Sequence, residues 1–201
     1  MTYPTLLLLH GWGFDPQLWD PLVEMLPGYR FVRWDRGYFG ETAESPVEAP
    51  VAAVGHSLGA MLLADRISPQ TPLIVINGFD HFTGEGATPR RVVERMRARF
   101  AETPDAVLND FRERCGASPV EKAISSEKLA ADLALLASHH AASTSTSILA
   151  LHGGEDPILP ASLRETAFPS AVRVTQTDAG HLLPISHPAW CAEQIEAFLC
   201  R

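Results

Sequence analysis

The sequence has no long apolar run, few cysteines and no excess of positive charge. Its longest apolar run near the start, Leu6–Leu9, is far shorter than the roughly 20 residues that cross a bilayer. That run also has neither the basic flank nor the cleavage site of a secretory signal. These absences predict a cytoplasmic protein that does not associate with membranes.

The cysteines and the charge exclude two further classes of protein. Cys115, Cys191 and Cys200 cannot all pair, and no two of them have the spacing of a zinc site. We therefore expect free, mostly structural thiols and no metal site. The 24 acidic residues exceed the 16 basic ones and give a formal net charge of −8. Nucleic-acid-binding proteins need a basic surface to neutralise phosphates, so the charge argues against a nucleic-acid partner.

Short apolar runs bounded by turn residues recur along the chain, as expected of strands buried in a parallel sheet. They are Thr5–Leu9, Tyr29–Trp34, Val51–Val54, Leu73–Ile76, Ser147–Leu151 and Val172–Gln176. Helical patterns separate or follow these runs at Pro16–Leu26, Leu58–Ile67, Ser162–Ala167 and Pro188–Leu199. This alternation predicts an α/β fold with a doubly wound, mostly parallel sheet of about six strands.

The alternation stops between Asn77 and about Thr146, where helix signals follow one another without a strand pattern. A helical insertion of this kind would lie over one edge of the sheet. We therefore predict a single core domain, formed by residues 1–78 and 147–201, and a helical lid formed by residues 79–146.

Capping signals place the helices of this insertion. Thr88-Pro89 and Thr103-Pro104 each put a capping residue before a proline at the first helical position. Ser118–Glu121 has the pattern of a capping box, and Gly116 is well placed to end the second helix. The insertion is thus predicted to contain several consecutive helices.

The sharpest local signal is the motif G-x-S-x-G at Gly55–Gly59, which follows an apolar strand and precedes a helical pattern. The serine of this motif lies in a strained turn from strand to helix, where side chains at the glycine positions would collide with the turn. Because both the strand and the helix are present, we predict that Ser57 is a nucleophile. The alternative is an ordinary glycine-rich turn.

A serine nucleophile needs a base within hydrogen-bond reach and a third group that holds the base. Asp156 and His181 each follow a predicted strand, so both should lie at the edge of the sheet that carries Ser57. We predict Asp156 as the acid, with Glu155 and Asp178 as competitors, and His181 as the base. Alternatively, Asp156 only caps the next helix and His181 is a loop histidine.

Acyl transfer also needs hydrogen-bond donors for the developing oxyanion. The first predicted strand opens into the glycine-rich loop His10–Gly13, whose backbone suits this role. We predict that the backbone N–H groups of Trp12 and Leu58 are the donors. The side chains of Trp12 and Phe14 are candidate pocket residues, with packing in the core as the alternative. This chemistry calls for no metal or organic cofactor.

The segments HGWG, Asp35–Gly40, GHSLG, GGEDPILP and AGH together resemble the α/β-hydrolase superfamily over nearly the whole chain. Within it, HGWG and Ile185–Pro188 look like the pimeloyl-acyl-carrier-protein methyl esterases of biotin synthesis. The resemblance implies hydrolysis of a methyl ester on an acyl group carried by acyl carrier protein, and a lid after the sixth strand of the family's fold. By motif it assigns the family's functional positions to the residues named above: Ser57, Asp156, His181, Trp12 and Leu58.

The chain departs from the family's pattern in the scaffold and beside the nucleophile. Only ten residues separate Gly40 from Val51, where the fold usually has a full helix, and no hairpin precedes the HGWG strand. His56 stands where the typical esterase of this group has tryptophan. We expect different local packing of the pocket at that position.

The predicted lid is locally basic. Residues 88–115 carry seven arginines against five acids, a local charge of +2 in a chain of −8. Apolar residues share one face of the first lid helix: Val92, Val93, Met96 and Phe100. Arg91, Arg95 and Arg99 recur at every fourth position on another face, a spacing at which like charges are mildly unfavourable. We predict that an acidic carrier protein or a phosphate of its prosthetic arm binds this stripe. A solvated face is the alternative.

The sequence leaves other functions open. A general short-chain carboxylesterase, or a lyase of the menaquinone-pathway type, would use the same fold and triad. A non-catalytic binding module would keep only the scaffold, and the complete set of triad residues argues against it.

Overall fold

A parallel sheet forms the centre of the molecule in the computed structural model, which describes residues 3–40, 49–143 and 145–200. Its six strands have the spatial order β2-β1-β3-β4-β5-β6, and every neighbouring pair is parallel. The strands are β1 (Thr5–Leu9), β2 (Arg30–Trp34), β3 (Ala52–His56), β4 (Leu73–Ile76), β5 (Ile148–Gly153) and β6 (Val172–Gln176). The predicted α/β fold and all six predicted strands are confirmed, with ends displaced by at most two residues.

Two layers of helices cover the sheet, as a doubly wound fold requires. Helices α2 (Leu58–Ala64) and α6 (Ala161–Thr166) pack on one face. The other face is covered by the 3₁₀ helix η1 (Pro16–Trp19) and by α1 (Asp20–Glu24), α7 (Leu183–Ser186) and α8 (Pro188–Leu199). The single helix predicted at Pro16–Leu26 is two short helices because Pro21 has no N–H group to continue the helical ladder.

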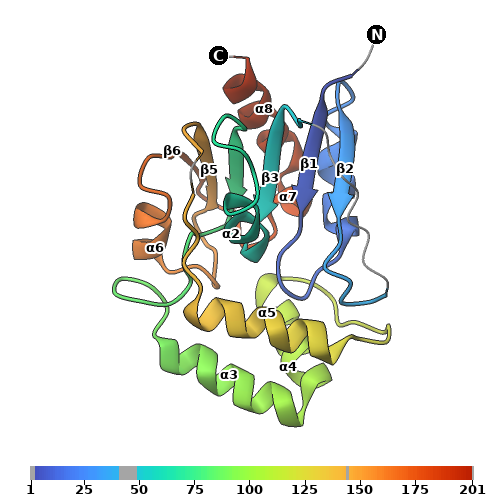
Figure 1. Ribbon diagram of the computed structural model, residues 1–201. Coiled ribbons are helices and arrows are strands. Elements are labelled where there is room, and N and C mark those ends of the chain that lie inside the picture. The colour runs from blue at the N-terminus through green and yellow to red at the C-terminus, as the bar shows by residue number, and fades with distance from the viewer. Residues whose placement is uncertain (1–2, 41–48, 144, 201) are drawn as a thin grey trace.

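Three helices occupy the predicted insertion between β4 and β5: α3 (Arg90–Glu102), α4 (Pro104–Cys115) and α5 (Ser126–Ser138). Figure 1 shows them together beyond the carboxyl ends of the strands, with α3 against both α4 and α5. In a parallel sheet this is the edge at which ligands bind. The insertion therefore covers the part of the fold where the predicted site residues converge.

Of the capping signals in this insertion, one is confirmed, one is displaced by a residue and one is wrong. Gly116 ends α4 in the left-handed conformation at φ 87°, as predicted. Helix α3 begins one residue later than the Thr88 signal indicated. The capping box predicted at Ser118–Glu121 is wrong, because this segment is not helical and hydrogen bonds to α4 instead. Arg112 donates to the Ser118 carbonyl and the Asn109 side chain accepts from the Val120 N–H.

Helix α5 is tied to the core by a buried polar network. Arg36 donates two hydrogen bonds to the Asp132 carboxylate, at 2.8 and 2.7 Å, and the Tyr38 hydroxyl donates a third. The indole N–H of Trp12 donates to the Leu129 carbonyl at 2.8 Å. The loops that follow β1 and β2 therefore fix the position of α5 above the sheet edge.

Three further expectations concern the cysteines, membrane-spanning helices and the connection after Gly40. The three cysteines are free, as predicted. In the ranges given above, no helix is long and apolar enough to cross a membrane. Most of the short connection between Gly40 and Val51 lies outside the described residues.

Candidate active site

Ser57 lies in a sharp turn between β3 and α2. Its backbone has φ 52° and ψ −123°, a conformation that costs energy for any residue except glycine. A Cβ on Gly55 would lie 2.3 Å from the Ala60 Cα, and one on Gly59 would lie 2.1 Å from the Leu9 carbonyl oxygen. Both glycines are thus required by close backbone contacts, which confirms the reason for expecting them.

Asp156 and His181 form a hydrogen-bonded pair in the interior. The His181 Nδ1 atom lies 2.8 Å from the Asp156 Oδ2 atom, and both side chains are completely buried. The other carboxylate oxygen, Oδ1, accepts from the N–H groups of Ile158 and Leu159 at 2.8 and 3.2 Å. The loop after β5 therefore holds the carboxylate in one orientation toward the histidine.

The pKa of the Asp156 carboxyl lies below its usual value. Burial alone raises this pKa, but the charge and hydrogen bond of His181 and the two backbone N–H groups outweigh burial. Asp156 is therefore ionised at neutral pH and accepts a hydrogen bond from the Nδ1–H group of His181.

The second ring nitrogen of His181, Nε2, is buried and makes no hydrogen bond to any described residue. With Nδ1–H directed at Asp156, Nε2 carries the lone pair in the neutral imidazole. The His181 ring packs against the His56 ring with their centroids 4.8 Å apart. Because His56 directly precedes Ser57, the imidazole lies beside the turn that carries the serine.

The competing acids do not contact His181. Glu155 is exposed, and its backbone N–H donates to the Ala179 carbonyl. Asp178 is 73% exposed and accepts from the Gln176 side chain. Of the three acids considered from the sequence, the structure brings only Asp156 to the histidine.

The sequence did not identify Asn77, which holds the histidine loop in place. Its side chain is fully buried, donates to the carbonyls of Gly180 and His181 at 2.9 Å each, and accepts from the Gly153 N–H at 2.7 Å. Its φ of 45° is also unusual for a residue other than glycine. The available signal was an asparagine directly after an apolar strand.

His56 also acts on the histidine loop. Its Nε2 atom lies 2.9 Å from the His181 carbonyl oxygen, so Nε2–H donates there. Burial and the neighbouring His181 lower the pKa of His56 to about 3. His56 is therefore a neutral donor that helps to position His181 at ordinary pH.

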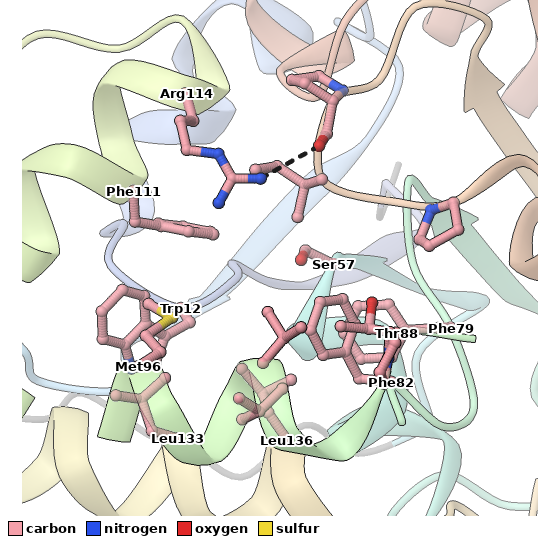
Figure 2. A pocket seen from close by; sticks show the side chains of 16 residues that line it. Trp12, Ser57, Phe79, Phe82, Thr88, Met96, Phe111, Arg114, Leu133 and Leu136 are labelled. Atoms are coloured by element: carbon pink, nitrogen blue, oxygen red, sulfur yellow. Dashed lines mark hydrogen bonds between the residues drawn. The ribbon is translucent and has the colours of Figure 1, made fainter. Parts of the chain in front are cut away.

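A cavity of about 270 Å³ opens onto Ser57 (Figure 2). Helices α3 and α5 contribute apolar side chains to its wall: Val92, Met96, Leu133 and Leu136. Helix α4 contributes Phe111 and Arg114. The insertion thus builds most of an apolar pocket above the serine.

The two aromatic residues of the first loop have different positions. Trp12 lines the cavity, as predicted. Phe14 does not line this cavity, and the alternative of core packing is correct. It packs edge-on against His56 and Phe111, and the Arg112 guanidinium lies 5.0 Å from its ring.

The backbone N–H groups predicted as oxyanion donors are both near Ser57. Leu58 begins α2, whose first N–H groups have no partner within the helix. The loop that carries Trp12 touches the serine, since a Cβ on Gly11 would lie 2.9 Å from the Ser57 Cβ. Neither N–H group donates a hydrogen bond to a described residue.

The arginine stripe of α3 lies outside the cavity. Arg91, Arg95 and Arg99 are exposed, and Arg99 pairs with Asp110 at 2.7 Å. The apolar face of α3 turns toward the site instead. The arginine that reaches the cavity is Arg114, which the sequence did not single out.

Nothing in the described ranges brings three His, Cys, Asp or Glu side chains together as a metal site. The arrangement consists instead of a strained serine, a buried acid–histidine pair and a covered apolar pocket at the carboxyl edge of a parallel sheet. The chain belongs to the alpha/beta hydrolase family, whose model matches residues 6–194.

Two relatives within that family carry the same name. The chain is 30% identical to the pimeloyl-[acyl-carrier protein] methyl ester esterase of Aromatoleum aromaticum, over 98% of both proteins. The protein of the same name from Legionella pneumophila is 26% identical over 96% of this chain and 94% of its own length. These matches confirm the resemblance found in the sequence.

Solved structures share the fold. An esterase from Exiguobacterium antarcticum superposes with a TM-score of 0.82 at 16% identity, covering all of this chain and 93% of the other. A thermophilic esterase from Thermogutta terrifontis gives a TM-score of 0.74 at 21% identity, covering 99% and 90%.

Proposed function

We propose that the protein is a serine carboxylic-ester hydrolase with Ser57 as nucleophile, His181 as base and Asp156 as the acid that orients the base. One observation carries this proposal. The buried His181 is held through Nδ1 by Asp156, and its Nε2 has no partner although the ring lies beside the strained Ser57 turn. The lone pair of Nε2 is therefore free to accept a proton, as a general base requires.

In this mechanism the Ser57 Oγ attacks the ester carbonyl while His181 Nε2 takes the hydroxyl proton. The backbone N–H groups of Trp12 and Leu58 stabilise the oxyanion. The imidazolium then passes its proton to the departing alkoxide, which leaves as an alcohol. Water hydrolyses the acyl-enzyme by the same route, and the products are a carboxylic acid and free Ser57.

The proposed substrate is the methyl ester of an acyl group carried by acyl carrier protein. Support comes from the names of the relatives, from the apolar cavity and from the exposed stripe of Arg91, Arg95 and Arg99. At roughly 30 Å³ per water molecule the cavity of about 270 Å³ holds about nine waters, room for a short acyl chain. Residues 79–146 would act as a lid onto which the carrier docks.

Two substrates separate this proposal from a general short-chain carboxylesterase. We expect wild-type protein to have a higher kcat/KM for pimeloyl-carrier methyl ester than for p-nitrophenyl butyrate. Replacing Arg91, Arg95 and Arg99 together by glutamine should lower only the carrier-linked value, by about tenfold or more at low salt. Neutralising Arg30 and Arg66, which are exposed elsewhere, is the control for Arg91 and Arg95 replaced as a pair.

Three results would contradict parts of this proposal. Turnover of the small ester alone would indicate a general carboxylesterase. Equal effects of the two arginine sets would reject docking on α3. Failure to rescue a biotin-requiring strain that lacks its esterase would remove the biotin assignment.

A further inference from the structure

Among the described residues that line the Ser57 cavity, Arg114 is the only charged one. It comes from the last turn of α4. Figure 2 shows its guanidinium extending past Phe111 at the side of the cavity that faces Ser57. The neighbouring cavity wall is made of aromatic and aliphatic side chains, and Arg114 itself is exposed, so its cation lies where the apolar wall meets solvent.

The guanidinium makes little use of its donors within the protein. In the described part of the chain its one hydrogen bond is from Nη2 to the Pro157 carbonyl, at 3.4 Å, and it has no ion pair. The nearby Asp156 carboxylate is already occupied by His181 and two backbone N–H groups. A guanidinium has five N–H donors, so most of those on Arg114 can bind a ligand.

Arg112, on the same helix, makes more contacts within the protein than Arg114 does. Arg112 donates to the carbonyls of Gly13 and Ser118, and its guanidinium stacks on Phe14. Arg112 therefore fastens α4 to the core. Arg114 makes no comparable set of contacts, although it lies only two residues further along.

An unpaired cation in this position attracts anions. The chain as a whole carries a net charge of −8. A negatively charged ligand is therefore attracted to the cavity by Arg114 and not by the charge of the protein as a whole. Arginine binds carboxylate and phosphate groups through paired, charge-assisted hydrogen bonds.

We propose that Arg114 determines substrate specificity by binding a negatively charged group of the substrate while the ester lies at Ser57. The inference rests on the proposed hydrolase function and deepens it. The substrate class is an ester whose acyl chain bears, further along, a carboxylate or a phosphate. Arg114 takes no part in bond breaking.

Three small methyl esters test this inference: monomethyl adipate, neutral dimethyl adipate and methyl 6-phosphonooxyhexanoate. We expect wild-type protein to prefer the charged esters. Arg114→Gln should reduce the ratio of charged to neutral kcat/KM by about tenfold, chiefly through KM, and Arg114→Lys should retain part of it. Arg90→Gln, on the exposed surface of the same insertion, should keep the wild-type ratio.

The two sources of negative charge give different results. A larger loss on monomethyl adipate assigns Arg114 to a carboxylate, and a larger loss on the phosphate ester assigns it to a phosphate. An unchanged ratio in Arg114→Gln, or a wild-type protein without preference, overturns the proposal. A role confined to ending α4 would lower the thermal unfolding midpoint and leave the ratio unchanged.

Binding measurements separate this inference from the hydrolase proposal. Calorimetry on Ser57→Ala compares the Kd of monomethyl adipate with that of dimethyl adipate, with and without Arg114→Gln. A difference that depends on Arg114 upholds the inference even if the wild-type protein hydrolyses none of the esters. The absence of that difference rejects the inference even if hydrolysis is found.

Discussion

Replacing Asp132 by leucine should loosen the insertion from the core. Asp132 is 1% exposed and accepts two hydrogen bonds from Arg36 and one from Tyr38. Leucine is similar in size but cannot accept any of them. The substitution therefore removes the buried carboxylate and leaves its donors in place.

The cost follows from the burial of the network. Removing one partner of a buried ion pair costs about 3–5 kcal/mol, and we expect the lower end because the Arg36 side chain is 20% exposed. A domain of this size loses roughly 2–4 °C of unfolding midpoint per kcal/mol. The expected decrease for Asp132→Leu is therefore about 6–12 °C.

Asp132→Leu should also alter the wall of the Ser57 cavity. Helix α5 carries Leu133 and Leu136 on the cavity wall, and its Leu129 carbonyl holds the Trp12 indole. We therefore expect KM to rise for small esters, because the pocket wall shifts while the Ser57 turn stays intact.

Urea unfolding at pH 7 measures the stability, and Glu94→Gln is the control. Glu94 pairs with Arg90 and Arg97 at the surface, and such exposed pairs contribute less than about 1 kcal/mol. The double variant Arg36→Met/Asp132→Leu should recover much of the loss. If Asp132→Leu costs no more than Glu94→Gln, the network does not secure α5 and the reasoning is refuted.

Three further predictions concern stability and the positioning of the site. Burial lowers the pKa of His56 to about 3 and that of His152 to about 4, whereas the unfolded chain takes up these protons near pH 6.5. The unfolding free energy should therefore fall as pH decreases from 7 to 5, by about 2 kcal/mol per histidine. Urea titrations at both pH values check this, and equal stabilities would contradict it. Asn77→Ala leaves buried groups unpaired and should lower the unfolding free energy by about 2–4 kcal/mol, with a fall in kcat of at least about tenfold. An unchanged kcat would show that the histidine loop holds itself in place. Gly59→Ala should not fold, because the new Cβ meets backbone, whereas Gly28→Ala meets nothing within 4 Å. Circular dichroism of the two variants decides the point.

Much of the fold could be predicted because parallel strands are buried on both faces and so appear as continuous apolar runs. The run Leu6–Leu9 is such a case, and all four residues are buried. Helix ends were harder to predict, because tertiary contacts override local signals. Ser118–Glu121 has a capping pattern, yet Arg112 and Asn109 hold this segment outside any helix.

The candidate site also contains some residues that local sequence predicts and others that it does not. Ser57, Asp156 and His181 lie in motifs that directly follow strands, so local sequence was enough to nominate them. Asn77 and Arg114 matter through groups that lie far away in the sequence. Asn77 bonds to a loop more than a hundred residues later, and Arg114 reaches the loop after β5 from α4. The position of Asn77 directly after an apolar strand was the one local signal for these two residues, and it does not reveal the partners of the side chain.

Labelling with a fluorophosphonate tests the central assignment most directly, since this reagent reacts with an activated serine hydroxyl. Intact mass and peptide mapping should find one adduct per chain, on Ser57, with esterase activity lost in proportion to labelling. Ser57→Ala should abolish the adduct, and His181→Ala should slow its formation by about a thousandfold or more. An adduct on another residue, or full esterase activity in Ser57→Ala, would contradict the account.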